Sequence, residues 1–203
     1  MLALGPYLPL AAAWAYPART VAVLAVLLAA SRRAIALRPS HGLSSTLLGV
    51  AVFAAWILPE LLFPGYRQHW LFHNAVLGAG SPAFEGAPHR DPFFLIFRVA
   101  GSVLLVPIVE ELFWRAWMMR RLISARFDRV APGTYSAESF WLTALLFASE
   151  HGPYWDVGLA AGIAYNWWML RTKSVADCIL AHAVTNGCLA AYVLVRGQWQ
   201  YWI

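Results

Sequence analysis

Charged residues are scarce in this sequence. Only 12% of its 203 residues are Asp, Glu, Lys or Arg, whereas 61% are hydrophobic and the mean hydropathy is +0.58. A soluble domain of this length does not need so many apolar residues, so the composition indicates an integral membrane protein whose surface faces the lipid bilayer. The net charge of +5 comes from basic residues in short loops between apolar runs. That placement is typical of membrane topology and gives no reason to expect a nucleic-acid partner.

Cysteine is also rare. Cys178 and Cys188 lie ten residues apart in one apolar segment, a spacing that excludes a disulfide framework and is not typical of a metal site. No HExxH motif is present. The N-terminus has no basic region ahead of its apolar run, so we expect a retained membrane segment and not a cleaved signal peptide. The length predicts a single integral membrane domain, residues 1–203, with no room for a second.

Long apolar runs dominate what is present. We predict an all-α fold, a polytopic transmembrane helical bundle of six to eight helices around a buried polar cavity. Six or seven of these helices should cross the membrane, because Pro17 and Arg19 interrupt the first run and make it one kinked span or two short ones. Residues 66–92 are rich in aromatic residues, Gly and Pro and are predicted to form an interfacial loop or a short amphipathic helix. The runs are 7–31, 44–63, 93–119, 140–151, 157–170 and 175–195.

Basic residues predict the orientation. If the loops after Ser31, Met119 and Leu170 are cytoplasmic, they hold nine basic residues, against three or four in the opposite loops. This asymmetry fits the positive-inside rule and places the C-terminus outside. The nine residues are Arg32, Arg33, Arg38, Arg120, Arg121, Arg126, Arg129, Arg171 and Lys173.

Two adjacent acids lie inside the run VPIVEELFWRAWMMRR, at Glu110 and Glu111. An ionised carboxylate in hydrocarbon costs several kcal/mol, so such residues usually face a protein interior or a wet cavity and have a function there. Glu111 and Arg115 are four apart with the acid first, which predicts an ion pair on one helical face. Neighbouring residues point about 100° apart, so Glu110 is expected to face other partners, the histidines of later segments. Pro107 is expected to kink the helix one turn before the acids.

Two later apolar segments carry a histidine each. His151 follows Phe147 by four residues, and His182 precedes Asn186 by four, so each pair shares a helical face. Alone, the first pair is typical of an ordinary polar helix end, and the second of hydrogen bonding between membrane helices. At about 1.5 Å per residue, Glu110, His182 and His151 lie roughly 13, 10 and 18 Å from the predicted cytoplasmic side. We therefore expect them to converge on one cavity open to the cytoplasm.

Two more acids lie close to these segments. Glu150 points about 100° away from His151 and is expected at most to support the site. Asp177 lies near a predicted membrane boundary and is expected to be solvated.

Together the three patterns resemble the ordered motifs of the CPBP family, which comprises the CAAX prenyl endopeptidases and bacteriocin-processing relatives. Each motif is short, but all three occur in order on separate apolar runs. The resemblance covers residues 93–195, a predicted catalytic core, whereas residues 1–92 agree only in being N-terminal membrane segments. The motifs are Glu110-Glu111-x-x-x-Arg115, Phe147-x-x-x-His151 and His182-x-x-x-Asn186.

The resemblance implies a glutamate-type, metal-independent intramembrane endopeptidase of a prokaryotic plasma membrane. It implies cleavage near the C-terminus of a membrane-tethered protein or peptide, and no particular oligomeric state. Glu110 and His151 would activate water, and His182 and Asn186 would form the oxyanion hole. The residues with supporting roles would be Glu111, Arg115 and Phe147.

Three alternatives stay open. One glutamate with two histidines is also the ligand composition of a catalytic zinc site, although the ligands would come from separate segments. A proton-coupled transporter also keeps carboxylates and histidines in the membrane, but it predicts repeat symmetry that this sequence does not show by eye. A non-catalytic scaffold or immunity protein would use the polar cluster for packing, and Glu110→Ala would then impair folding and not a chemical step.

Overall fold

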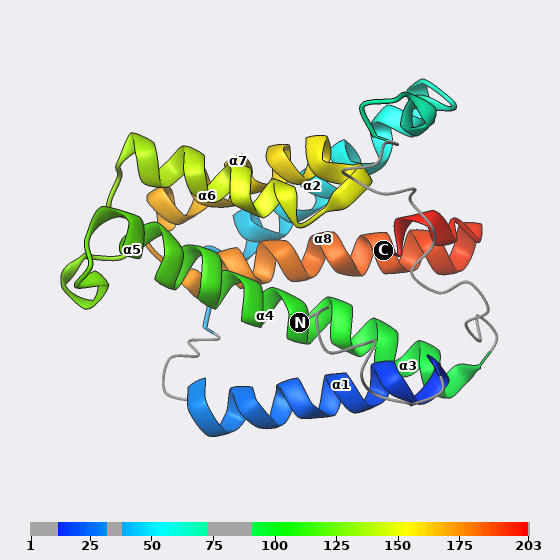
Figure 1. The fold of residues 1–203 in the computed structure, drawn as a ribbon, viewed down its shortest axis with the longest axis horizontal. Coiled ribbons are helices and arrows are strands. Elements are labelled where there is room, and N and C mark those ends of the chain that lie inside the picture. The colour runs from blue at the N-terminus through cyan, green and yellow to red at the C-terminus, as the bar shows by residue number, and fades with distance from the viewer. Residues whose placement is uncertain (1–11, 32–37, 73–90, 203) are drawn as a thin grey trace.

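The computed structural model describes residues 12–31, 38–72 and 91–202. Throughout these residues the regular structure is helical, which confirms the predicted all-α class (Figure 1). Within these described ranges six long helices occur, one for each predicted apolar run. They are α1 (Ala12–Val26, extended by the π-helical turn Leu27–Ser31), α2 (Gly42–Leu62), a continuous helix from Pro92 to Ile123, α6 (Ala137–Ser149), α7 (Trp155–Thr172) and α8 (Val175–Arg196).

Four of these helices are long and apolar enough to cross a membrane, namely Trp14–Ser31, Gly42–Leu62, Pro92–Ile123 and Val175–Arg196. The protein is therefore an integral membrane protein. Helix α6 is apolar but has only 13 residues, about 20 Å, which is less than the hydrocarbon thickness of about 30 Å. The first segment is a single helix in its described part, with Pro17 inside it. Of the predicted interfacial region, Tyr66–Gln68 form one 3₁₀ turn, and residues 73–90 lie outside the described residues.

Local sequence signals set the helix ends. Asp91 caps the helix that begins at Pro92, accepting a backbone N–H at 2.9 Å, and proline is favoured at this first position because its missing N–H has no helical partner there. Ser174 caps α8 by accepting the N–H of Asp177 at 3.3 Å. The same helix ends at Gly197, whose φ of 66° is the left-handed conformation that glycine adopts without strain.

The helix that carries the adjacent acids contains two π-helical turns. It runs through α3 (Pro92–Ala100), a π turn at Gly101–Leu105, α4 (Val106–Glu111), a second π turn at Leu112–Met118, and α5 (Met119–Ile123). Pro107 lies directly after the first π turn, which accommodates the missing N–H of proline without ending the helix. Because each π turn adds a residue to a helical turn, the two turns decide which faces α4 presents to its neighbours.

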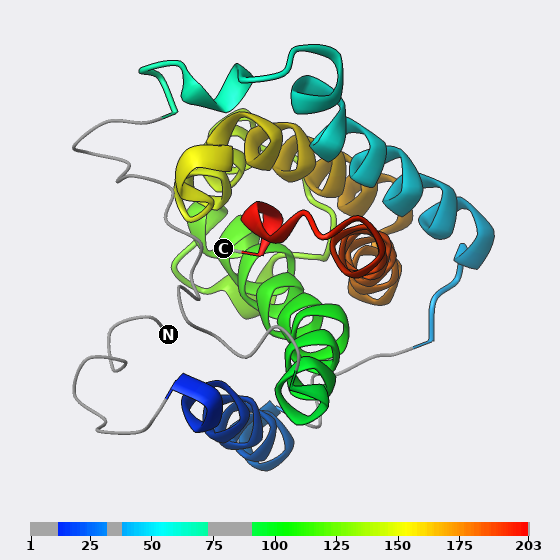
Figure 2. The ribbon, with the colours of Figure 1, turned by 90° about the vertical axis from the view of Figure 1, so that its right-hand side faces the viewer.

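Helix α8 lies at the centre of the bundle. It contacts α2, α7 and α4, while α1 packs on the outside against α3 (Figure 2). The α2–α8 contact is close: a Cβ at Gly49 would lie 2.4 Å from the carbonyl oxygen of Ala181. Thr185 donates a hydrogen bond to the Gly49 carbonyl at 2.9 Å. Small residues at a membrane-helix interface allow such backbone approach, and here it positions the face of α8 that carries His182.

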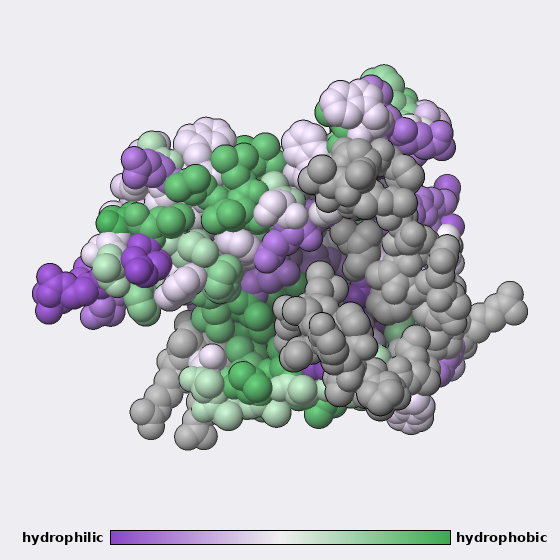
Figure 3. Space-filling view, viewed as in Figure 1, coloured by the Kyte–Doolittle hydropathy of each residue, from purple (hydrophilic) through white to green (hydrophobic). Residues whose placement is uncertain are grey.

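The ends that carry most basic residues gather on one side of the bundle. The end of the first helix, the α5–α6 connection and the α7–α8 connection all lie at the left of Figure 1, where hydrophilic residues also protrude beyond the apolar face in Figure 3. This grouping is the one that the positive-inside argument requires.

Asp177 differs from its prediction. It lies at that same end, but it is fully buried and not solvated. Its carboxylate accepts hydrogen bonds from the backbone N–H groups of Ser40 and His41, at 3.1 and 2.8 Å, and from the hydroxyl of Ser45 at 3.1 Å. A carboxylate can be buried when several donors replace its water. Asp177 therefore connects the start of α2 to the start of α8.

Candidate functional site

The predicted ion pair on the acid-bearing helix is present. Glu111 and Arg115 are both fully buried, and a guanidinium nitrogen lies 3.1 Å from the Glu111 Oε1 atom. The other carboxylate oxygen, Oε2, is buried and has no hydrogen-bond partner among the described residues. A buried pair of this kind needs further hydrogen bonds to offset the loss of hydration.

Arg115 obtains those further bonds from α7. Its Nε donates to the side-chain oxygen of Asn166 at 3.1 Å, and its Nη2 donates to the Gly162 carbonyl at 3.4 Å. Asn166 in turn donates to the carbonyl of Phe140 on α6 at 2.8 Å. The sequence reasoning missed Asn166, which is fully buried. The available signal was an Asn within a mostly apolar helix, a position typical of hydrogen bonding between membrane helices.

His182 on α8 meets Glu111, not Glu110. Its Nδ1 lies 2.8 Å from Glu111 Oε1, so a single carboxylate oxygen serves both Arg115 and His182. The sequence reasoning had assigned the contact with the histidines to Glu110. The structure differs because the face of α4 that carries the ion pair also faces α8. Since an ionised carboxylate only accepts hydrogen bonds, Nδ1 of His182 carries the proton and Nε2 is the nitrogen left for other chemistry.

Glu110 lies beside this pair with its side chain only partly shielded. It makes no hydrogen bond to another described residue, but it is close enough to His182, Arg115 and Glu150 for their charges to act on it. Glu150 itself is exposed at the end of α6. Among the described residues, Glu110 is thus the acid of the pair that has no hydrogen-bond or ion-pair partner.

His151 is held at the end of α6 by its own helix. Its Nδ1 lies 2.7 Å from the Phe147 carbonyl, which only accepts, so this nitrogen carries a proton and Nε2 of the neutral ring is an acceptor. The imidazole packs between Phe147 and Trp56, with ring centroids 4.6 and 5.3 Å away. Gly158 leaves room for the ring, because a Cβ there would lie 3.0 Å from it.

Phe147 is the side chain that links the two histidines. Its ring lies 6.2 Å from that of His182 and 4.6 Å from that of His151, and the Arg115 guanidinium lies over it at 4.5 Å. The three sequence motifs therefore converge on one buried cluster. Asn186 lies one turn beyond His182 and donates one N–H to the Ser102 carbonyl at 2.8 Å, which leaves its second N–H available.

Tyr165 on α7 is a second residue that the sequence reasoning missed. Its ring stacks on that of His182 with centroids 5.1 Å apart and planes 22° from parallel. Its hydroxyl donates to Thr185 at 2.7 Å. The imidazole is therefore held on one edge by a carboxylate and on one face by an aromatic ring. A tyrosine within an apolar helix gives little signal of such a role in sequence.

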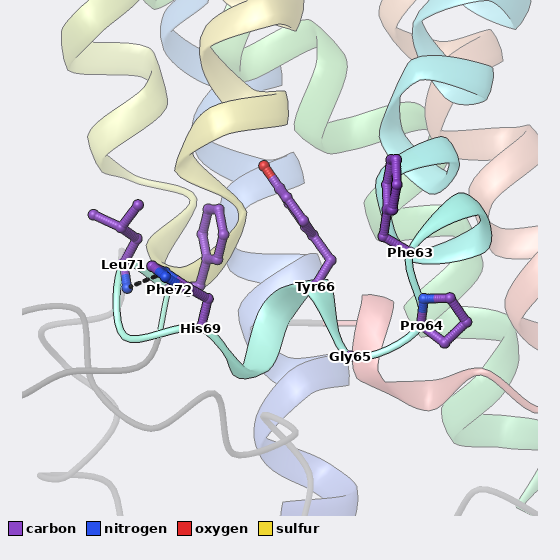
Figure 4. A pocket seen from close by; sticks show the side chains of 7 residues that line it. All are labelled: Phe63, Pro64, Gly65, Tyr66, His69, Leu71 and Phe72. Atoms are coloured by element: carbon purple, nitrogen blue, oxygen red, sulfur yellow. Dashed lines mark hydrogen bonds between the residues drawn. The ribbon is translucent and has the colours of Figure 1, made fainter.

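Two hollows in the described part of the molecule lie away from this cluster. One is lined by the segment Phe63–Phe72 after α2 (Figure 4), and the other lies between α1 and α3. Neither is lined by a motif residue, so the predicted polar cavity stays a prediction. Among the described residues, no three His, Cys, Asp or Glu side chains are grouped closely enough to hold a metal ion.

Comparison with known proteins agrees with the motifs. Residues 92–188, just under half of the chain, match the protein-family model described as Type II CAAX prenyl endopeptidase Rce1-like. This match confirms the resemblance based on the three motifs, all of which lie within the matched residues. Searches of curated proteins and of solved structures gave no significant match.

Proposed function

We propose that this protein is an intramembrane endopeptidase, because residues 92–188 of a membrane-spanning chain match the family described as Type II CAAX prenyl endopeptidase Rce1-like. It hydrolyses a peptide bond near the C-terminus of a membrane-tethered protein or peptide. The observation that carries this proposal is the buried cluster in which all three motifs meet, with the unengaged acid Glu110 beside it.

Glu110 and His151 activate the water. Glu110 accepts the proton from the attacking water, and the acceptor nitrogen Nε2 of His151 orients that water toward the scissile carbonyl. A carboxylate that no neighbouring residue engages is suited to this task because its lone pairs are not already occupied. When the tetrahedral intermediate collapses, the C–N bond breaks and Glu110 returns the proton to the leaving amine.

His182 and Asn186 stabilise the oxyanion. Asn186 contributes the N–H that Ser102 leaves available. His182 contributes Nε2–H, which requires the doubly protonated imidazole because Nδ1–H is already directed at Glu111. The Glu111 carboxylate and the Tyr165 ring hold the imidazole in place. Removal of one oxyanion donor typically lowers the rate about 100- to 1,000-fold.

The mechanism uses water activated by protein side chains and is independent of metal. The Nδ1 atoms of His151 and His182 are both occupied, by the Phe147 carbonyl and by Glu111. Zinc is the alternative, with Glu110 and the two Nε2 atoms as ligands. In this proposal the site opens toward the cytoplasm, the side from which a membrane-tethered substrate reaches it, and the basic helix ends support that orientation.

The test compares purified wild-type protein with Glu110→Ala and His182→Ala. Glu138→Ala is the matched control, an exposed acid in the first turn of α6. Each protein is incubated in phospholipid nanodiscs with fluorescent peptides that carry either a farnesylated C-terminal cysteine or a transmembrane anchor. The products are identified by mass, with and without a strong chelator.

We expect cleavage by the wild type and by the control, no cleavage by the two site variants, and no effect of the chelator. Loss of activity with chelator that added zinc restores would assign ligand roles to Glu110, His151 and His182. If well-folded wild-type protein cleaves no peptide of the panel and Glu110→Ala lowers only its stability, the scaffold or immunity function replaces the enzyme. Proton-coupled uptake into vesicles by the wild type would instead identify a transporter.

A further inference from the structure

The segment after α2 binds to the N-terminal end of α7 (Trp155–Thr172) through hydrogen bonds and an ion pair. Tyr66–Gln68 form a 3₁₀ turn in this segment, and Figure 2 shows it passing across the start of α7. The Arg67 Nη1 donates to the Asp156 carboxylate at 2.5 Å and to the Pro153 carbonyl at 2.7 Å. Both partners are only partly exposed, 13% for the Arg67 side chain and 17% for Asp156.

The turn that carries Arg67 is built for this contact. The Glu60 carboxylate accepts the backbone N–H groups of Gly65 and Arg67, at 2.9 and 3.1 Å. Gly65 has a φ of 85°, a conformation that side chains other than glycine rarely adopt. Glu60 and Gly65 therefore fix the geometry of the turn independently of the contact between Arg67 and α7.

Tyr66 and an aromatic cage complete the contact. Tyr66 donates its hydroxyl to the other oxygen of Asp156 at 3.2 Å. Burial and the neighbouring Asp156 carboxylate raise the pKa of the Tyr66 phenol, so it stays protonated and able to donate. Three rings surround the Arg67 guanidinium, those of Tyr154, Phe72 and Tyr66 at 4.4, 5.0 and 5.3 Å. Figure 4 shows the rings of Tyr66 and Phe72 directed from the loop toward the helices.

Arg67 contacts the residues that directly follow His151 in the chain. Residues Gly152–Tyr154 form the 3₁₀ turn between α6 and α7, and the Tyr154 N–H bonds to the His151 carbonyl at 2.9 Å. Trp56 packs against both His151 and Tyr154, with ring centroids 5.3 and 6.3 Å away. Arg67 therefore holds the Pro153 carbonyl and the Tyr154 ring, so the His151 backbone is restrained from its outer side as well as by α6.

From these contacts we infer that Arg67, with Asp156, is a positioning residue for His151. The inference rests on the proposed function, in which His151 orients the attacking water. Arg67 lies outside residues 92–188, the stretch matched by the family model, so the N-terminal part of the chain contributes to the site. A displacement of about 1 Å in a reacting group can cost about 100-fold in rate.

The experiment uses Arg67→Met, which keeps an apolar stem but removes the charge and the donors. Arg196→Met is the matched control, an exposed arginine in the last turn of α8. We expect Arg67→Met to lower kcat about 10- to 100-fold with KM within about twofold of wild type. Arg67→Lys, which keeps the charge, should recover part of kcat. Asp156→Asn should lower kcat too, and the double variant Arg67→Met/Asp156→Asn should lose no more than Arg67→Met alone, because both act through one contact.

A second readout does not depend on cleavage. In protein labelled with ¹⁵N-histidine, the imidazole resonances of His151 are assigned by their loss in His151→Gln. They should shift in Arg67→Met and remain in place in Arg196→Met. If the wild type cleaves no peptide, the proposed function fails, and the resonance shift alone decides whether Arg67 positions His151. Unchanged kcat together with unchanged resonances in Arg67→Met overturns the inference. If Arg67→Met does not fold, Arg67→Lys and Asp156→Asn carry the same comparison.

Discussion

Replacing Arg115 by methionine should separate the structural role of the buried cluster from its catalytic role. The substitution keeps an apolar side chain in a fully buried position but leaves Glu111 without its guanidinium partner. It also removes the donors to the side-chain oxygen of Asn166 and to the Gly162 carbonyl. Arg115→Met is therefore a direct test of the energetics of this site.

Its magnitude follows from the burial. Removing one partner of a buried ion pair costs about 3–5 kcal/mol, because the remaining charge is left uncompensated. In a chain of about 200 residues each kcal/mol shifts the unfolding midpoint by about 2–4 °C. The midpoint of Arg115→Met should therefore fall by about 6–20 °C. Arg121→Met is the matched control, an exposed arginine at the end of the same helix whose midpoint should not move.

The double variant Glu111→Gln/Arg115→Met removes the stranded charge as well. A neutral amide still accepts the hydrogen bond from His182 Nδ1, so most of the lost stability should return. Activity should not return, because the negative charge that lies against His182, the oxyanion donor, is then lost. A loss of about 100-fold relative to wild type is expected.

The assay follows thermal unfolding of detergent-solubilised protein by size-exclusion chromatography with fluorescence detection, and peptide cleavage on the same samples. An Arg115→Met protein as stable as wild type would refute the uncompensated-charge argument. A double variant that recovers stability and full activity would refute the role of Glu111 in supporting His182.

Three further substitutions give separate tests. Glu110→Gln should lower kcat about 100- to 10,000-fold as the loss of a general base, with an unchanged unfolding midpoint; a fall in stability with normal turnover would contradict this. Gly49→Leu should destabilise the fold by about 1–3 kcal/mol, because a Cβ there would lie 2.4 Å from the Ala181 carbonyl oxygen. Thermal unfolding measures the loss, and the control is Gly42→Leu, at a position where a Cβ would meet nothing within 4 Å. Asp177→Ala should destabilise by about 1–3 kcal/mol, because it leaves donors near the start of α2 unpaired; a wild-type midpoint would show that they are satisfied otherwise.

Much of the fold could be predicted because it depends on local composition. Runs of apolar residues predicted the six long helices of the described residues, since backbone groups in lipid must be satisfied within a helix. Only four of these helices are long and apolar enough to cross a membrane, against six or seven predicted spans. Basic residues predicted which helix ends lie together. The spacing of Glu111 and Arg115 predicted their ion pair, because residues four apart share a helical face whatever surrounds them.

The partner of His182 was decided only by the tertiary structure. Which of two adjacent acids faces α8 depends on the rotation of α4, and the π turns on either side of it set that rotation. The prediction that Asp177 is solvated was wrong for a similar reason. Its position near a membrane boundary suggested solvation, but the donors that bury it come from a segment more than 130 residues earlier in the chain.

The sequence by itself thus determined the class of protein, the helices and the three motifs, because each depends on residues close together along the chain. The tertiary structure alone decided that His182 contacts Glu111, that Tyr165 stacks on the imidazole, and that Arg67 contacts the turn after His151. The Glu111–His182, Tyr165–His182 and Arg67–Pro153 contacts join residues 71, 17 and 86 positions apart, and no local periodicity carries that information. They arise from how the helices pack, which the buried polar groups themselves constrain because each must find a partner inside the membrane.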